Sequence, residues 1–153
     1  KGLNTVKLVQ EAFIIKEEER RRGHTFNQYW VVFDKDDFSN HDFNEAIRLA
    51  ESNGFHVAYS NQAFEYWFLL HFNLYRGYIN RNDYEQMLCQ LMKVKYSKKG
   101  NFTAKIYGML LPYQKDAIAR AKKILDEFGT TPPSQAVSST TVFKLVEELN
   151  RFL

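Results

Sequence analysis

Three carboxylates follow directly after an apolar run in this sequence. Asp34, Asp36 and Asp37 come after residues 29–33, five aromatic or β-branched residues with no polar residue between them. Alternation along an extended chain points Asp34 and Asp36 to the same side. Two carboxylates on one side repel each other unless a cation lies between them, and their hard oxygen atoms suit Mg²⁺ or Mn²⁺. The pattern therefore predicts a metal site, with a solvated acidic turn as the alternative.

A second group of candidates lies in the apolar stretch 61–72, which we predict to be a helix. Glu65 is the only acid in this stretch, and a buried carboxylate needs a partner. Asn61 stands four residues earlier, on the same helix face. We predict that Glu65 completes the metal shell or acts catalytically; the alternative is a first-turn residue that stabilises the helix dipole. His71 is a candidate general base, or a histidine satisfied at a helix end.

The stretch between Glu85 and Asp116 contains six lysines and no acidic residue, with aromatic side chains interleaved. Lysines neutralise phosphates and exposed aromatic rings stack on bases, so this composition favours contact with nucleic acid. We expect residues 97–101 to form a mobile loop that closes over a bound strand. The alternative is an ordinary solvated loop whose aromatic residues belong to the core. The residues in question are Lys93, Lys95, Lys98, Lys99, Lys105 and Lys115, with Tyr96, Phe102, Tyr107 and Tyr113.

The elements that must position these side chains follow from the hydrophobic pattern. An apolar run such as 29–33 is typical of a strand buried on both faces, and 55–59 indicates a second strand. A helix over 42–53 between them makes a β–α–β unit with parallel strands and a right-handed crossover. The carboxyl ends of both strands then lie at one edge of the sheet, where α/β folds place their ligands. We therefore expect Asp34 to face the residues that follow Tyr59.

The rest of the chain predicts helices and a single domain. A length of 153 residues is that of one ordinary domain. The Ser/Thr/Pro-rich connection at 130–141 is expected to cross the surface. The fold class is α/β, a parallel sheet with flanking helices and a helical carboxyl-terminal part. Apolar residues at helical spacing predict further helices over about 5–22, 80–92, 114–128 and 141–152.

Composition narrows the class of protein. An apolar fraction of 44% and an aromatic fraction of 16% indicate a packed globular protein rather than a disordered one. No apolar run approaches the ~18 residues of a membrane span, and no leader pattern opens the chain, so neither a membrane nor export is expected. Cys89 is the only cysteine, which excludes an internal disulfide and a cysteine zinc cluster and fits a reducing, cytoplasmic setting. A net charge of +3 indicates no partner by itself.

Four stretches of the sequence resemble the RloB-like proteins. The acidic stretch 30–37 and the stretch 60–72 carry most of the likeness, which extends from about residue 3 to the end of the chain. Residues 95–98 (Lys-Tyr-Ser-Lys) and 138–146 are similar to later elements of that family. RloB-like proteins are associated with bacterial restriction and phage-defence loci, and their fold is Toprim-like. The resemblance implies a Mg²⁺-dependent phosphoryl-transfer site in which Asp34 and Asp36 are the Asp-x-Asp pair.

One feature of the family has no match in this sequence. Toprim-type proteins have an earlier strand that ends in a glutamate, and RloB-like proteins carry a Glu-Gly near their start. We therefore expect residues 1–153 to be a single Toprim-like RloB domain without its amino-terminal strand and without one catalytic carboxylate. Such a chain would be weakly active or inactive as it stands.

The leading hypothesis is a Mg²⁺- or Mn²⁺-dependent nuclease that cleaves DNA or RNA in phage defence, with another defence protein as a further partner. One alternative is a non-catalytic module that binds nucleic acid or a partner, its acidic cluster serving as a structural cap. Another is a pocket for a nucleotide signal that controls a partner effector. The predicted residues are Asp34, Asp36, Glu65 and His71 for catalysis, Asp34, Asp36 and Asp37 for the metal, and Asn61, Lys95, Lys98 and Lys99 for the substrate.

Overall fold

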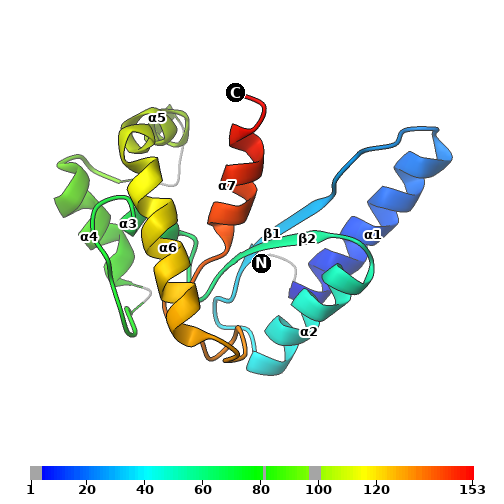
Figure 1. Ribbon diagram of the computed structural model, residues 1–153, viewed down its shortest axis with the longest axis horizontal. Coiled ribbons are helices and arrows are strands. Elements are labelled where there is room, and N and C mark those ends of the chain that lie inside the picture. The colour runs from blue at the N-terminus through cyan, green and yellow to red at the C-terminus, as the bar shows by residue number, and fades with distance from the viewer. Residues whose placement is uncertain (1–4, 81, 97–100) are drawn as a thin grey trace.

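A two-stranded parallel sheet lies between two groups of helices in the computed structural model of this chain (Figure 1). Strands β1 (Trp30–Asp34) and β2 (His56–Ser60) are joined through α2 (Asn40–Ser52), and their register pairs Asp34 with Ser60. This confirms the predicted β–α–β unit and brings the carboxyl ends of both strands to one edge of the sheet. The structure describes residues 5–80, 82–96 and 101–153.

A first layer of helices covers one face of the sheet. Helix α1 (Thr5–Arg21) packs beside α2 on this face, as the apolar residues of both helices predict (Figure 1). Helix α2 begins after Ser39, whose side-chain oxygen accepts a hydrogen bond from the backbone N–H of Asp42 at 3.0 Å and so caps the helix. The buried apolar residues of this layer are Val9, Val31, Phe33, Phe43, Ala46, Ile47, Ala50, Phe55, Val57 and Tyr59.

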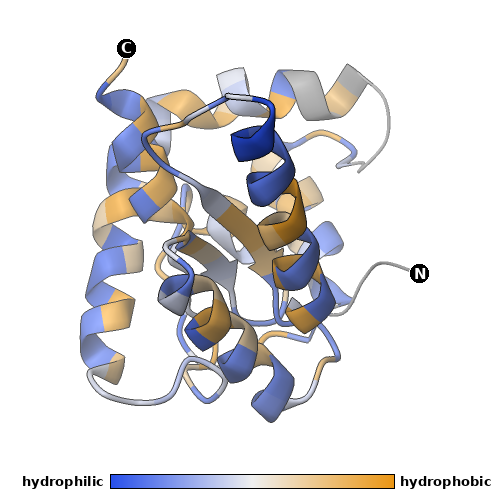
Figure 2. Ribbon diagram, turned by 90° about the vertical axis from the view of Figure 1, so that its right-hand side faces the viewer, coloured by the Kyte–Doolittle hydropathy of each residue, from blue (hydrophilic) through white to orange (hydrophobic). Residues whose placement is uncertain are grey.

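A second layer covers the other face and holds the larger apolar core. Tyr66, Leu69 and Leu70 of this core are completely buried. Helices on both sides of the sheet show apolar stripes among polar residues when the chain is coloured by hydropathy (Figure 2). No described helix is long and apolar enough to cross a membrane. The elements of the second layer are α3 (Glu65–Leu69), α4 (Asp83–Met92), α5 (Asn101–Leu110), the 3₁₀ turn η1 (Leu111–Tyr113), α6 (Gln114–Phe128) and α7 (Val142–Asn150).

Two segments of the second layer differ from the prediction. The regular helix predicted over 61–72 is limited to α3, so Asn61 lies before the helix and does not share a helix face with Glu65. Helix α5 and η1 lie between the helices predicted over 80–92 and 114–128, where no further helix was predicted. Ile106 and Leu110 are buried at helical spacing, but the poor helix former Gly108 interrupts the pattern between them, and the lysines of this region favoured another interpretation.

The prediction that β1 is buried on both faces is wrong. Val31 and Phe33 are buried against the first layer, but the side chain of Val32, on the opposite face, is 41% exposed. The second layer leaves a groove of about 240 Å³ beside Val32. We call it the apolar groove, and its other lining residues are Phe64, Trp67, Phe68, His71, Ile106, Tyr107, Leu110, Leu111, Gln114, Val142, Leu145, Val146 and Leu149.

The prediction that residues 130–141 cross the surface is wrong for the second half of this segment. Ser138, Ser139 and Thr140 are buried, and Thr140 forms an antiparallel bridge with Ser60. The segment therefore borders β2 on the edge that β1 leaves open. Hydroxyl side chains can bond to nearby backbone groups, which explains why a Ser/Thr-rich segment is stable in the core.

Candidate functional site

The acidic turn, residues 34–37, is held by the backbone that follows β2. The N–H of Lys35 donates to the carbonyl of Ser60, and the N–H of Asp36 donates to the carbonyl of Gln62, both at 2.9 Å. The pairing of the two strands therefore continues past their ends. This pairing places the acidic turn beside the residues after β2. Strand β1 ends at Asp34, so the alternation that predicted Asp34 and Asp36 on the same side does not continue to Asp36.

Among the described residues, two of the four non-glycine residues with a positive φ lie at this junction. Asp36 has a φ of 49° and Gln62 a φ of 81°, which is the left-handed region that residues other than glycine seldom adopt. These two strained residues are the ones joined by the 2.9 Å hydrogen bond. Each such conformation costs on the order of 1 kcal/mol or more, and strain of this kind clusters where a side chain must be held in one position.

The carboxylates of the turn differ in their surroundings. Asp34 and Asp36 are half-buried, the Oδ1 atom of Asp36 is buried, and Asp37 is exposed. The ammonium of Lys35 donates to the carbonyl of Phe38 at 3.2 Å. Two hard oxygen donors on one short segment fit Mg²⁺ or Mn²⁺. Within residues 5–80, 82–96 and 101–153, however, no group of three or more His, Cys, Asp or Glu side chains is placed to hold a metal ion.

Asn61 is buried directly after β2, with only 1% of its side chain exposed. Its backbone N–H donates to the carbonyl of Ser139 and its side-chain amide donates to the carbonyl of Pro133, both at 2.8 Å. Its Oδ1 atom is buried and has no hydrogen-bond partner among the described residues. A buried acceptor without a donor costs about 1–3 kcal/mol, so this oxygen is available to a ligand.

The residues that border β2 form a polar layer beside Asn61. The hydroxyl of Thr141 accepts a hydrogen bond from the N–H of Tyr59 at 2.9 Å, and that of Thr140 donates to the carbonyl of Tyr59 at 2.9 Å. Thr140 also bonds to the hydroxyl of Ser60 at 2.8 Å. The sequence pattern did not predict this contribution to the sheet edge, although residues 138–146 resemble an element of the RloB-like family.

Glu65 is buried, as predicted, but its observed partner is a tyrosine. The carboxylate is 5% exposed, and Oε1 accepts a hydrogen bond from the hydroxyl of Tyr96 at 3.1 Å. Burial, together with the nearby charge of Glu65, raises the pKa of both Tyr96 and Tyr84. Glu65, Asp34 and Asp36 do not form a metal-binding group in the described structure.

His71 lies in the wall of the apolar groove and is almost fully buried. Its Nδ1 atom lies 3.0 Å from the carbonyl of Trp67, which can only accept, so Nδ1 carries the proton. Burial lowers the pKa of His71, and the neighbouring Arg120 acts in the same direction. The observed bond is that of a histidine satisfied at the end of a helix, the second of the two roles predicted for it.

The basic region is partly surface and partly core. The side chains of Lys93, Lys95, Lys105, Lys115, Tyr107 and Tyr113 are exposed. Tyr96 is buried, and Phe102 packs against it with ring centroids 5.7 Å apart. These lysines and the two exposed tyrosines are at the surface, whereas Tyr96 and Phe102 belong to the core, as the alternative expected for the aromatic residues. The predicted residues Lys98 and Lys99 and most of the predicted loop lie outside the described residues.

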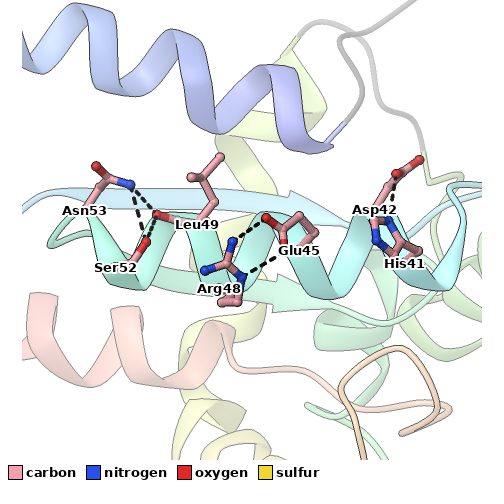
Figure 3. A network of polar contacts seen from close by, with 7 residues as sticks. All are labelled: His41, Asp42, Glu45, Arg48, Leu49, Ser52 and Asn53. Carbon is pink, nitrogen blue, oxygen red and sulfur yellow. Dashed lines mark hydrogen bonds and ion pairs between the residues drawn. The ribbon is translucent and has the colours of Figure 1, made fainter.

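The charged residues on α2 are engaged with one another. Glu45 binds Arg48 through two hydrogen bonds of 2.8 and 2.6 Å, and this contact lowers the pKa of the Glu45 carboxyl (Figure 3). His41 lies 3.5 Å from Asp42 at the start of the same helix (Figure 3). These side chains form a surface network along α2, so they add no candidate ligand to the acidic turn.

Fold and site define a mixed α/β protein with a parallel β–α–β unit and an acidic turn at the carboxyl edge of its sheet. The sequence model of the RloB-like protein family matches residues 1–149. The chain therefore belongs to the RloB-like family, as the resemblance predicts. Neither a curated protein nor a solved structure matches the chain.

Proposed function

We propose that this RloB-like protein is a metal-dependent nuclease that hydrolyses phosphodiester bonds in DNA or RNA. The observation that carries the proposal is the acidic turn. Asp34 and Asp36 follow β1 at the carboxyl edge of a parallel sheet, and Asp36 is held in a strained conformation by Gln62. A strained backbone at a carboxylate on this edge supports a functional site.

Each part of the chain has a distinct role in this proposal. Asp34 and Asp36 hold Mg²⁺ or Mn²⁺, with the exposed Asp37 as a further oxygen donor. The bound ion supplies charge neutralisation at the scissile phosphate and a more acidic water. The orphaned amide oxygen of Asn61 accepts a hydrogen bond from the substrate or from its hydration shell. The exposed lysines of the basic region bind the phosphate backbone, and Tyr107 offers a ring for base stacking.

The finer description of the fold and the biological role is also a proposal. Family membership and the parallel β–α–β unit support a single Toprim-like domain over residues 1–153. Family membership likewise supports a role in bacterial phage defence beside restriction systems, in the cytoplasm and with another defence protein as partner.

The first experiment measures Mg²⁺ and Mn²⁺ binding by calorimetry, followed by cleavage of labelled DNA and RNA. Binding that is present in the wild type and absent in Asp34→Asn/Asp36→Asn supports the metal site. In a longer protein that includes the amino-terminal glutamate of the family, we expect Asp36→Asn to lower metal-stimulated cleavage at least about 100-fold, the loss typical of a removed electrostatic contact in an active site. Asp126→Asn, at an exposed carboxylate on α6, is the control. Equal rates for Asp36→Asn and wild type would contradict the proposal.

A non-catalytic module that binds nucleic acid is the second candidate. It is favoured by the finding that no three acidic, histidine or cysteine side chains of the described chain form a metal-binding group. This candidate predicts binding that weakens with salt, does not require Mg²⁺ and survives Asp34→Asn. Comparing the affinity for one oligonucleotide with and without Mg²⁺ separates the two functions.

A further inference from the structure

Tyr96 is fixed on several sides between α4 and α5. Its hydroxyl donates to Glu65 Oε1 at 3.1 Å, and its backbone N–H donates to the sulfur of Cys89 at 3.1 Å. Its ring contacts those of Phe68 and Phe102 edge-on, with centroids 6.4 and 5.7 Å away. Tyr96 therefore joins the end of α4 and the start of α5 to α3.

The hydrogen bond between Tyr96 and Glu65 depends on the chemistry of both side chains. A buried carboxylate is stable only when donors surround it. Burial and the charge of Glu65 both raise the pKa of Tyr96, so this phenol stays protonated and able to donate. Glu65 is also the first residue of α3, which closely follows the carboxyl edge of β2. Tyr96 is thus bonded to α3, the helix that follows the end of β2 beside the acidic turn.

Exposed cations lie on both sides of Tyr96 in the chain. Lys93, with a φ of 54°, ends α4, and Lys95 follows it; both are exposed. Lys105 is exposed on α5, one turn after Phe102. We call Lys93, Lys95 and Lys105 the basic strip. Because Tyr96 contacts α3 directly and α5 through Phe102, it determines where both parts of this strip lie relative to the sheet edge.

We propose that Glu65 and Tyr96 are positioning residues that hold the basic strip against α3, so that its lysines meet the phosphate backbone of a nucleic acid. Glu65 acts through Tyr96 and is not a ligand of the metal. The inference rests on the proposed function, whose substrate is a nucleic acid, and it deepens that function by assigning how the substrate surface is oriented. A phosphate backbone fits because three exposed cations lie in a stretch that contains no acidic residue.

The test compares two tyrosines that each lose one buried hydroxyl. Tyr96→Phe removes the bond to Glu65, and the control, Tyr66→Phe, removes the 2.8 Å bond from the fully buried Tyr66 to the carbonyl of Tyr75. Affinity for a fluorescent single-stranded oligonucleotide is measured by anisotropy over a range of salt concentrations. We expect Tyr96→Phe to weaken binding about tenfold and to make it less dependent on salt, since phosphate contacts are lost. Tyr66→Phe should bind as the wild type does.

Conservative and disruptive changes at Glu65 complete the test. Glu65→Gln keeps an oxygen that accepts the bond from Tyr96, so it should retain both oligonucleotide affinity and metal affinity, whereas Glu65→Ala should bind oligonucleotide as weakly as Tyr96→Phe. Metal binding lost in Glu65→Gln would overturn the positioning role. Equal affinities for Tyr96→Phe and Tyr66→Phe would overturn the inference while the proposed function stands. A wild type that binds no oligonucleotide would overturn the proposed function together with this inference.

Discussion

Two buried polar side chains of this protein, those of Glu65 and His71, each bond to a specific partner. Glu65 is buried against Tyr96, and His71 is buried with its Nδ1–H on the carbonyl of Trp67. Asp36, in contrast, is held through its own backbone N–H. The main chain of Asp36 is therefore fixed against the residues that follow β2, and the side chains of Glu65 and His71 are each bonded directly.

The burial of His71 predicts a pH dependence of stability. Its pKa is lowered in the folded state from the ordinary 6.5, so the unfolded chain binds its proton first as the pH falls. Stability contributed by the neutral ring is present above about pH 6.5 and is lost below it, by at most ~1.4 kcal/mol per pH unit, until the folded-state pKa is reached.

The variant His71→Leu tests this dependence. The free energy of unfolding from urea titrations should fall less between pH 7 and pH 5 for His71→Leu than for the wild type. His41→Gln, which changes a histidine on the surface, should follow the wild type. Parallel pH profiles for wild type and His71→Leu would show that His71 does not cause the loss.

At the level of elements, residues 138–141 act as a third strand for the sheet. The hydroxyls of Thr140 and Thr141 bond to the backbone of Tyr59, and the backbone N–H of Thr141 also donates to the carbonyl of Tyr59 at 2.8 Å. This explains why a Ser/Thr-rich connection is buried. Composition predicted a surface segment because polar side chains are usually solvated, but here they complete the hydrogen bonding of β2.

Replacing Thr141 by valine should destabilise the sheet edge. Valine has nearly the shape of threonine, but it leaves the buried N–H of Tyr59 without its acceptor, which costs about 1–3 kcal/mol. The free energy of unfolding in urea measures this loss. Thr130→Val, at an exposed position in the same connection, is the matched control and should change stability by less than about 0.5 kcal/mol. Equal effects of the two substitutions would mean that the bond is unimportant.

At the level of the whole molecule, positive charge is unevenly distributed. The arginines at the end of α1 pair with glutamates of the same helix, Arg20 with Glu17 at 3.1 Å and Arg22 with Glu19 at 2.6 Å. The lysines between Glu85 and Asp116 have no acidic neighbour in that stretch of sequence. The small net charge of +3 therefore understates the attraction of this region for a polyanion.

The salt dependence of nucleic-acid binding should reflect this uneven distribution of positive charge. Each phosphate contact adds about 0.7 to the slope of log K against log salt concentration for a single strand. We expect Lys105→Ala to lower this slope by about that amount and to weaken binding to all sequences alike. Lys144→Ala, at an exposed lysine on α7, should leave the slope unchanged. A slope unchanged by Lys105→Ala would show that Lys105 on α5 does not contact the nucleic acid.

The β–α–β unit, the position of Asp34 and Asp36 at the sheet edge, and the burial of Glu65 could be predicted from the sequence. Short connections and apolar periodicity are local properties, and they determine which face of an element is buried and how neighbouring strands run. These local properties do not determine which residues pack against the buried face of an element. The bond from Tyr96 to Glu65 spans 31 residues and that from Tyr59 to Thr141 spans 82, so both depend on how the whole chain packs. Only the tertiary structure therefore decided that Glu65 binds a tyrosine, that residues 138–141 complete the sheet, and that Val32 lies in an open groove.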